Sequence, residues 1–211
     1  MAKKSKKRGA LRLKGERHYE LTKIDVAEAH IKTAVWLYFQ NAHPVPIYTL
    51  ASAAREILTT IGDKIGVETT LHRLAKKRGE SLKSLIAKIH LHATFFKHAN
   101  SDTTATLDFS ETEVDPVLQL ACHDFGRVAK GMPIEAQVFE AFIMCLAFAR
   151  VSDAPLRRQQ MLKFAFQHFY GVRSSTLAEA KKIGLRILER AASDPTLQME
   201  YSRVVTPESI R

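Results

Sequence analysis

Hydrophobic residues recur along most of this chain at three- and four-residue steps, a spacing that gathers them on one face of an α-helix. The clearest pattern belongs to a helix predicted to start at Pro44, and its apolar positions are Ile47, Leu50, Ala51, Ala54, Ile57, Leu58 and Ile61. Proline suits the first turn of a helix, and Gly62 is expected to end it. The small side chains of Ala51 and Ala54 would let a neighbouring helix approach closely.

A helix of similar length is predicted just before this one. Thr22 can cap it, and Asp25 three residues later completes a capping-box pair. The helix extends to about Asn41, after which His43 and Pro44 interrupt the pattern. Because the connection between the two helices is short, we expect them to pack as antiparallel neighbours.

Six further helices are predicted from the same spacing, over residues 67–77, 81–102, 115–130, 134–151, 156–170 and 176–191, with Asp115 and Ser175 as caps. Residues 103–109 are expected to form an exposed, polar connection. An α/β fold would need several strands, and the pattern offers one weak candidate. The sequence therefore predicts an all-α fold, an antiparallel helical bundle of about six to eight helices in a single domain over 21–192.

Charge is distributed unevenly along the chain. The net charge is +10, and residues 1–17 contain eight basic residues against one acidic residue. Little apolar content accompanies them, so residues 1–20 are expected to be a disordered basic tail, and residues 193–211 an irregular tail. The basic tail is either a solubilising terminus or an arm that contacts nucleic-acid phosphates through residues such as Lys3, Lys4, Lys6, Lys7 and Arg8.

Composition also bears on the location of the protein. Cys122 and Cys145 each lie in an apolar helical pattern, which indicates buried free thiols and suits a reducing cytosol. The basic start is not followed by an apolar run, so we expect no signal peptide. The most apolar stretch, residues 138–151, is too short to span a bilayer and contains Glu140 and Arg150. These features predict a cytoplasmic protein without a membrane partner.

Candidate chemistry concentrates in the helix over 81–102. Its apolar stripe is Leu82, Leu85, Ile86, Ile89, Ala93 and Phe96, and its polar cluster is His90, His92, Lys97, His98, Asn100 and Asp102. His90 and His92 are two residues apart, and His98 is expected well round the helix from His90, so the spacing does not suit a metal site. The chain also lacks a glycine-rich phosphate loop and a nucleophile turn. We therefore predict no metal and no cofactor.

The polar cluster has a structural and a functional interpretation. An imidazolium at a helix end interacts favourably with the helix dipole or with free carbonyls, and this needs no ligand. In the functional interpretation, His98 contacts a ligand or RNA together with Lys97 and Asn100. Adjacent helical positions point about 100° apart, which argues against joint action of Lys97 and His98 on one group.

The order of the helices and the position of His98 resemble HEPN domains, compact helical bundles of many prokaryotic RNA-targeting and toxin proteins. In that family, a pair of antiparallel helices precedes a helix with an Arg, a polar residue, three variable residues and a His. Here residues 25–40 and 46–61 resemble the opening pair, and His98 stands at the position of the family's His. The family's Arg falls on Ala93 and its polar neighbour on Thr94.

The resemblance implies metal-independent attack of an RNA 2′-hydroxyl on phosphate, with His98 transferring a proton and Lys97 and Asn100 contacting phosphate. This chemistry also needs charge stabilisation, which Arg supplies as a bidentate fork and Lys only as a point charge. With Ala93 in place of Arg, we expect RNA binding with impaired or absent ribonuclease activity. The resemblance further implies a homodimer, in which the second helix or the helix over 81–102 supplies the shared face.

Two alternatives to RNA binding are open. The first is a helical interaction or scaffold protein that uses an apolar face and has no nucleic-acid role. The second is an enzyme acting on a small molecule, which would need a pocket lined by several of His90, His92, His98, His123 and His168.

Overall fold

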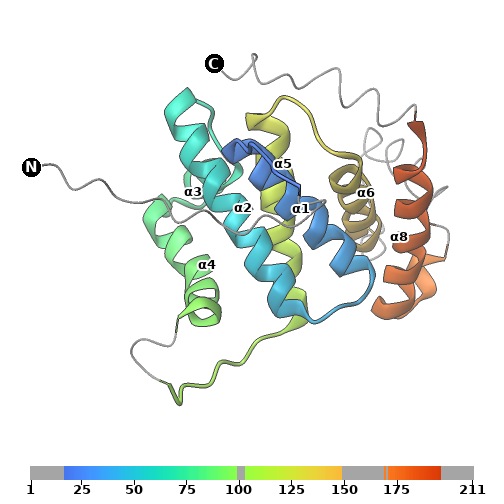
Figure 1. Cartoon of the computed structure of the whole chain (residues 1–211). Helices are drawn as coiled ribbons and strands as arrows, with labels where there is room; N and C mark the ends of the chain where they lie inside the picture. The colour runs from blue at the N-terminus through green and yellow to red at the C-terminus, as the bar shows by residue number, and fades with distance from the viewer. Residues whose placement is uncertain (1–16, 99–102, 149–168, 170, 196–211) are drawn as a thin grey trace, which may run out of the picture.

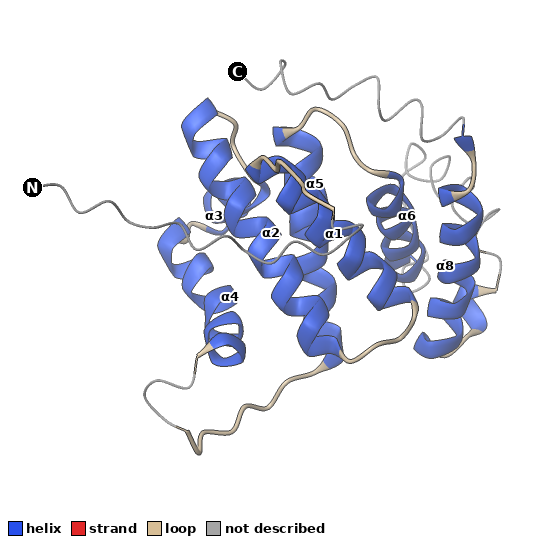
Figure 2. Ribbon diagram, in the orientation of Figure 1, coloured by secondary structure: helices blue, strands red, loops and turns tan. Residues whose placement is uncertain are grey.

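The computed structural model describes residues 17–98, 103–148, 169 and 171–195 (Figure 1). These residues form seven α-helices and two short 3-10 helices, and no strand occurs among them (Figure 2). The elements are α1 (Lys23–Phe39), α2 (Pro44–Ile65), α3 (Thr70–Arg78), α4 (Leu82–Lys97), η1 (Glu111–Glu113), α5 (Val114–Val128), α6 (Ile134–Phe148), η2 (Val172–Ser174) and α8 (Leu177–Ala192). The predicted all-α bundle is confirmed.

Several predicted segments fall largely outside the described residues. These are most of the basic tail, most of the C-terminal tail, and all but residue 169 of the helix over 156–170. None of the helices in the described part of the chain combines the length and hydropathy that a bilayer span requires.

Helix α2 lies at the centre of the bundle and packs against α1, α5 and α4 (Figure 1). Its apolar side chains Ala51, Ala54 and Leu58 are fully buried. Because the side chains of Ala51 and Ala54 are small, neighbouring helices can approach α2 closely at these positions. Residues 40–43 turn the chain from α1 into α2, which gives the expected antiparallel pair.

The predicted end of α2 at Gly62 is wrong, because the helix continues for one more turn to Ile65. Gly66, with φ of +71°, ends it in the left-handed conformation that glycine adopts at little cost. Gly62 instead serves close packing. A Cβ there would lie 2.9 Å from the carbonyl oxygen of Val67 and 3.0 Å from Cγ2 of Thr69.

Two helices begin with a capping box, in which the cap residue and the residue three positions later exchange hydrogen bonds. At α1 the prediction is confirmed, since the Thr22 N–H donates to Asp25 Oδ2 at 2.8 Å and the Asp25 N–H donates to Thr22 Oγ1 at 3.2 Å. At α8 the predicted cap, Ser175, is wrong by one residue. Thr176 is the cap, because its backbone N–H donates to Oε2 of Glu179, three residues later, at 2.8 Å.

Helix α5 begins one residue before its predicted cap, at Val114. Residues Ser110 and Glu113 form a capping box on the 3-10 helix η1, which leads directly into α5. Asp115 therefore lies inside the first turn, where a carboxylate favourably meets the helix dipole.

Helix α4 is shorter and more peripheral than the sequence indicated. It ends at Lys97, and only Leu85 and Ala93 of its predicted stripe are buried. On its outer side, Leu91 and Phe95 are 64% and 39% exposed. Helix α4 therefore covers one side of α2 and is not the element around which the bundle is organised.

Aromatic rings fill the core where the C-terminal end of α1 meets α6. Tyr38 packs edge-on against Phe139 with ring centroids 5.1 Å apart, and Phe39 packs in the same way against Phe142 at 5.1 Å. Helix α8 approaches this cluster through Gly184, where a Cβ would overlap the ring of Phe39. The contact between α1 and α8 therefore requires glycine at this position.

We predict that Gly184→Ala destabilises the protein by about 1–3 kcal/mol, because the ring of Phe39 must shift within a packed core. The free energy of unfolding in urea measures the effect. Gly126→Ala is the matched control, since a Cβ in helix α5 meets only the flexible end of Met132 at 3.2 Å. Equal unfolding free energies for the two variants would contradict the packing described for α8.

Candidate functional site

A pocket of about 250 Å³ lies between α2 and α4. Its lining residues come from these two helices and from the residue that follows α4: Ser52, Glu56, His90, Ala93, Thr94, Lys97 and His98. The α2 residues are four positions apart, and the α4 residues follow steps of three, four and seven from His90, so each set lies on one helix face. Three members of the predicted polar cluster, His90, Lys97 and His98, therefore line a pocket.

The pocket brings together His90, Lys97 and His98, which the sequence analysis had expected to diverge. That expectation was wrong because it treated His98 as helical. His98 is the C-cap of α4 in an extended conformation, with φ of −133° and ψ of 133°, and its N–H donates to the carbonyl oxygen of Thr94 at 3.0 Å. Helical angles therefore do not apply to His98, and its side chain shares the pocket with Lys97 and His90.

The remaining predicted contact residues are not placed. Asn100 and the tail residues Lys3, Lys4, Lys6, Lys7 and Arg8 lie outside the described residues. His90 was predicted as part of the polar cluster and of a possible histidine pocket, and Ser52 and Glu56 were not predicted at the site. The helical spacing of His90, Thr94 and Lys97 is a signal that could have grouped them.

Burial and positive charge set the electrostatics of the pocket. Burial, the guanidinium of Arg55 and the ammonium of Lys97 lower the pKa of His90, against the opposing effect of the Glu56 carboxylate. The pKa of His30 on α1 is lowered by burial and by Lys97. The imidazole of His90 is therefore neutral near pH 7 and able to accept a proton.

Arg55 lies behind the pocket on α2 and is 1% exposed. Its Nε and Nη2 atoms have no hydrogen-bond partner among the residues that the structure describes. Burial lowers its pKa, and the charges of Glu56 and Asp124 act in the opposite direction. Its guanidinium acts on the pocket through its charge and is not one of the lining groups.

The pocket can attract an anion and accept a proton. Lys97 supplies an ammonium group, His90 a neutral imidazole, and Glu56 a carboxylate that opposes anion binding. No guanidinium lines the pocket within the described part of the chain, so a fixed bidentate clamp for phosphate is missing there.

Other histidines are held by structural contacts. His92 Nδ1 lies 3.2 Å from Glu113 Oε2, and its ring packs edge-on against Tyr48 with centroids 5.7 Å apart. His123 Nε2 lies 2.7 Å from Glu140 Oε2. Residues 17–98, 103–148, 169 and 171–195 contain no group of three or more His, Cys, Asp or Glu side chains that could hold a metal ion. Of the five histidines named for a small-molecule enzyme, His90 and His98 line this pocket, His92 and His123 do not, and His168 lies outside the described residues.

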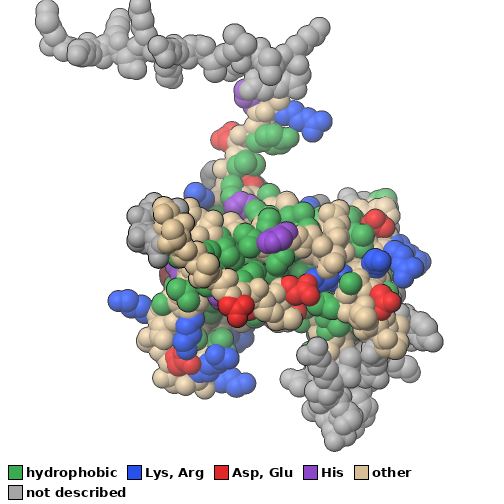
Figure 3. Space-filling model, turned by 90° about the horizontal axis from the view of Figure 1, so that it is seen from below, with side chains coloured by type: hydrophobic (Ala, Val, Ile, Leu, Met, Phe, Trp, Pro, Cys, Tyr) green, Lys and Arg blue, Asp and Glu red, His purple; other side chains and the backbone are tan. Residues whose placement is uncertain are grey.

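The surface seen from below carries no continuous basic patch among its described side chains (Figure 3). Histidine and hydrophobic side chains occupy the middle of this face, and Lys and Arg side chains lie towards its two sides.

No family model matches this chain, and no curated protein or solved structure matches it. The resemblance to HEPN domains therefore stays a prediction from the residues.

The lowered pKa of His90 makes the stability of the fold sensitive to acid. Below the ordinary histidine value of 6.5, the unfolded chain binds the proton more readily, so this contribution to stability is lost as pH falls through the folded pKa. His123 acts in the opposite direction, because Glu140 raises its pKa. Its contribution is complete below pH 6.5 and is lost as pH rises through the raised pKa.

We therefore predict that His90→Asn loses less stability than the wild-type protein between pH 7.5 and pH 5.5, whereas His123→Asn loses more. Urea unfolding at the two pH values measures both differences. The opposite ordering of the two variants, or identical pH slopes, would contradict the assignment of these charges.

Proposed function

We propose that this protein binds RNA and that the pocket between α2 and α4 contacts RNA phosphates. The observation that carries the proposal is the convergence of His90, Lys97 and His98 on one concave surface. The resemblance of the helix order to HEPN domains supports the same function, and the basic residues 1–17 would add non-specific attraction to phosphate.

Binding without efficient cleavage is the activity that we propose. Ala93, at the place of the family's Arg, is 5% exposed and lines the pocket, so it supplies no charge to a phosphate. Arg55 is close enough to lower the pKa of His90 but is fully enclosed by the bundle. In-line attack by a 2′-hydroxyl would therefore lack the guanidinium fork that stabilises the transition state.

The partner and the location form part of the same proposal. Leu91 and Phe95 are exposed one turn apart on the outer side of α4, and a second copy of the chain could cover them in a homodimer. The free, buried thiols of Cys122 and Cys145 suit the cytoplasm.

The exposed pair on α4 also supports a second candidate function. A helical interaction protein without a nucleic-acid role would use Leu91 and Phe95 as the start of an apolar docking face. In that case the pocket beside them would have no ligand, and substitutions at Lys97 would leave RNA binding unchanged.

The RNA proposal predicts opposite effects for the two charged groups of the pocket. Lys97→Gln should weaken binding of a single-stranded RNA. It should also make the slope of the logarithm of the association constant against the logarithm of the salt concentration shallower by about 0.7, the change expected when one phosphate contact is lost. Glu56→Gln should strengthen binding, because it removes a carboxylate that repels phosphate. Fluorescence anisotropy of the full chain across a salt series measures both.

Two controls separate the pocket from the tail. Lys83→Gln removes a charge from an exposed position of α4 that does not line the pocket, and it should leave the salt slope unchanged. A full chain with Lys3, Lys4, Lys6, Lys7 and Arg8 changed to Gln should bind more weakly but still respond to Lys97→Gln. Loss of all binding in the tail variant, with no response to Lys97 in the wild-type background, would overturn the proposal.

A further inference from the structure

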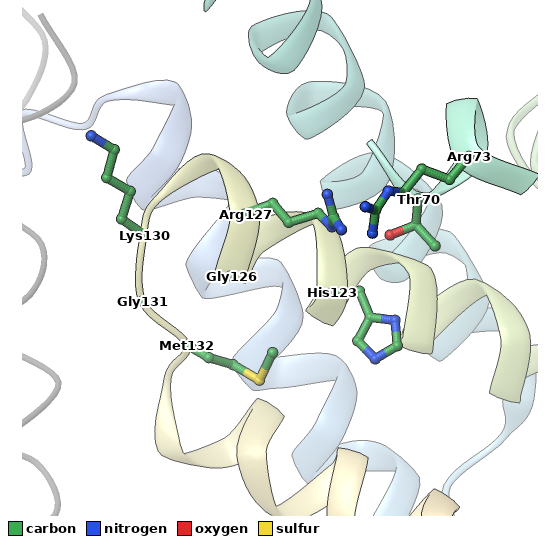
Figure 4. Close-up of a pocket in the computed structure, with 8 residues that line it drawn as sticks. All are labelled: Thr70, Arg73, His123, Gly126, Arg127, Lys130, Gly131 and Met132. Atoms are coloured by element: carbon green, nitrogen blue, oxygen red, sulfur yellow. The ribbon is translucent and has the colours of Figure 1, made fainter. Parts of the chain in front are cut away.

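A second and larger pocket, of about 550 Å³, opens between the start of α3 and the C-terminal half of α5. Figure 4 shows the side chains that line it, which come from α3, from α5 and from the turn that follows α5. It shares no lining residue with the pocket between α2 and α4. The two sites can therefore be tested separately.

Cationic side chains form one part of the wall. Arg73 comes from α3, Arg127 from α5 and Lys130 from the turn. In Figure 4 the guanidinium groups of Arg73 and Arg127 reach the same region beside Thr70, while Lys130 extends outward. Two planar forks from different helices are suited to the oxygen atoms of one phosphate.

The positive charge of this wall is only partly neutralised. Arg127 Nη1 donates to the backbone oxygen of Glu68 at 3.1 Å, which fixes the guanidinium without cancelling its charge. Arg73 Nε lies 3.7 Å from the carboxylate of Glu68, which already pairs with Lys76 at 2.5 Å. Among the described residues, no carboxylate lies within 4 Å of the Lys130 ammonium or the Arg127 guanidinium.

Two carboxylates lie close by without occupying the wall. Asp124 is fully buried and accepts the N–H of Thr70 at 2.6 Å. Glu140 pairs with His123, whose ring lines the pocket and whose pKa this carboxylate raises. These contacts hold the N-terminal end of α3 and the imidazole in place.

The other part of the wall is apolar. Met132 lines it together with Gly126 and Gly131, which carry no side chain. The methyl group of Met132 lies close over Gly126, at 3.2 Å from the position of a Cβ. A flat ring can pack against the thioether of Met132.

We propose that this pocket binds a nucleoside phosphate, with the phosphate held by Arg73 and Arg127 and the base packed against Met132. The proposal does not depend on RNA binding at the other site. It requires a ligand that carries both an anionic group and an aromatic ring, because the pocket offers partners for each.

Isothermal titration calorimetry of the full chain with AMP, adenosine and inorganic phosphate tests the proposal. We expect AMP to bind at one site, more tightly than either adenosine or phosphate. Arg127→Gln and Met132→Ala should each weaken AMP binding about tenfold, the effect of losing one charged or packing contact. Arg73 is an exposed residue, so Arg73→Gln gives the same test without a risk to folding.

Lys83→Gln, which removes a charge from an exposed position of α4 outside both pockets, is the matched control and should leave AMP binding unchanged. No heat of binding for AMP at millimolar concentration would overturn the proposal. Equal affinity for AMP and inorganic phosphate would overturn the role of the apolar wall. Equal weakening by Lys83→Gln and Arg73→Gln would overturn the assignment to this pocket.

Discussion

The burial of α2 on several sides is the constraint on which the rest of the structure depends. Helices α1, α5 and α4 all pack against it, and Ala51, Ala54 and Leu58 are completely covered. The same enclosure takes in polar positions, since Ser52 and Arg55 are also buried. A buried guanidinium is costly unless it is compensated, so α2 places a positive charge inside the bundle at a considerable cost in stability.

This buried charge connects the fold to the candidate site. Arg55 is one of the groups that keep His90 neutral, while burial contributes most to the lowered pKa. Ser52 and Glu56 reach the pocket from the same helix, and α4 closes it from the outside with His90 and Lys97. The centre of the bundle therefore provides the electrostatic background, and the peripheral helix provides the groups that a ligand would meet.

Much of the fold could be predicted because it follows from local rules. The spacing of apolar residues gave the helices of the described region, and Thr22 with Asp25 gave the start of α1. Helix ends were less predictable, since the chain also uses glycine for close packing. Gly62 looked like a stop signal in the sequence, but the carbonyl oxygen of Val67 packs against it and α2 continues.

The candidate site was predictable only in part. The polar cluster on α4 could be recognised from the sequence, but the conformation of His98 depends on how the helix ends, and the burial of Arg55 depends on packing by distant segments. The second pocket combines α3 with α5, and two of its lining residues, Thr70 and Arg127, are more than 50 positions apart in the sequence. The spacing of apolar residues along the chain does not show which distant helices lie side by side.

We propose that RNA contacts the folded domain at the pocket between α2 and α4. Photocrosslinking of a 4-thiouridine-containing RNA to the full chain, followed by mass spectrometry of the crosslinked peptides, tests this most directly. If RNA binds at this pocket, crosslinks are expected within residues 90–98 and around Ser52 and Glu56 on α2. Crosslinks confined to residues 1–17, or none to the chain at all, would contradict it.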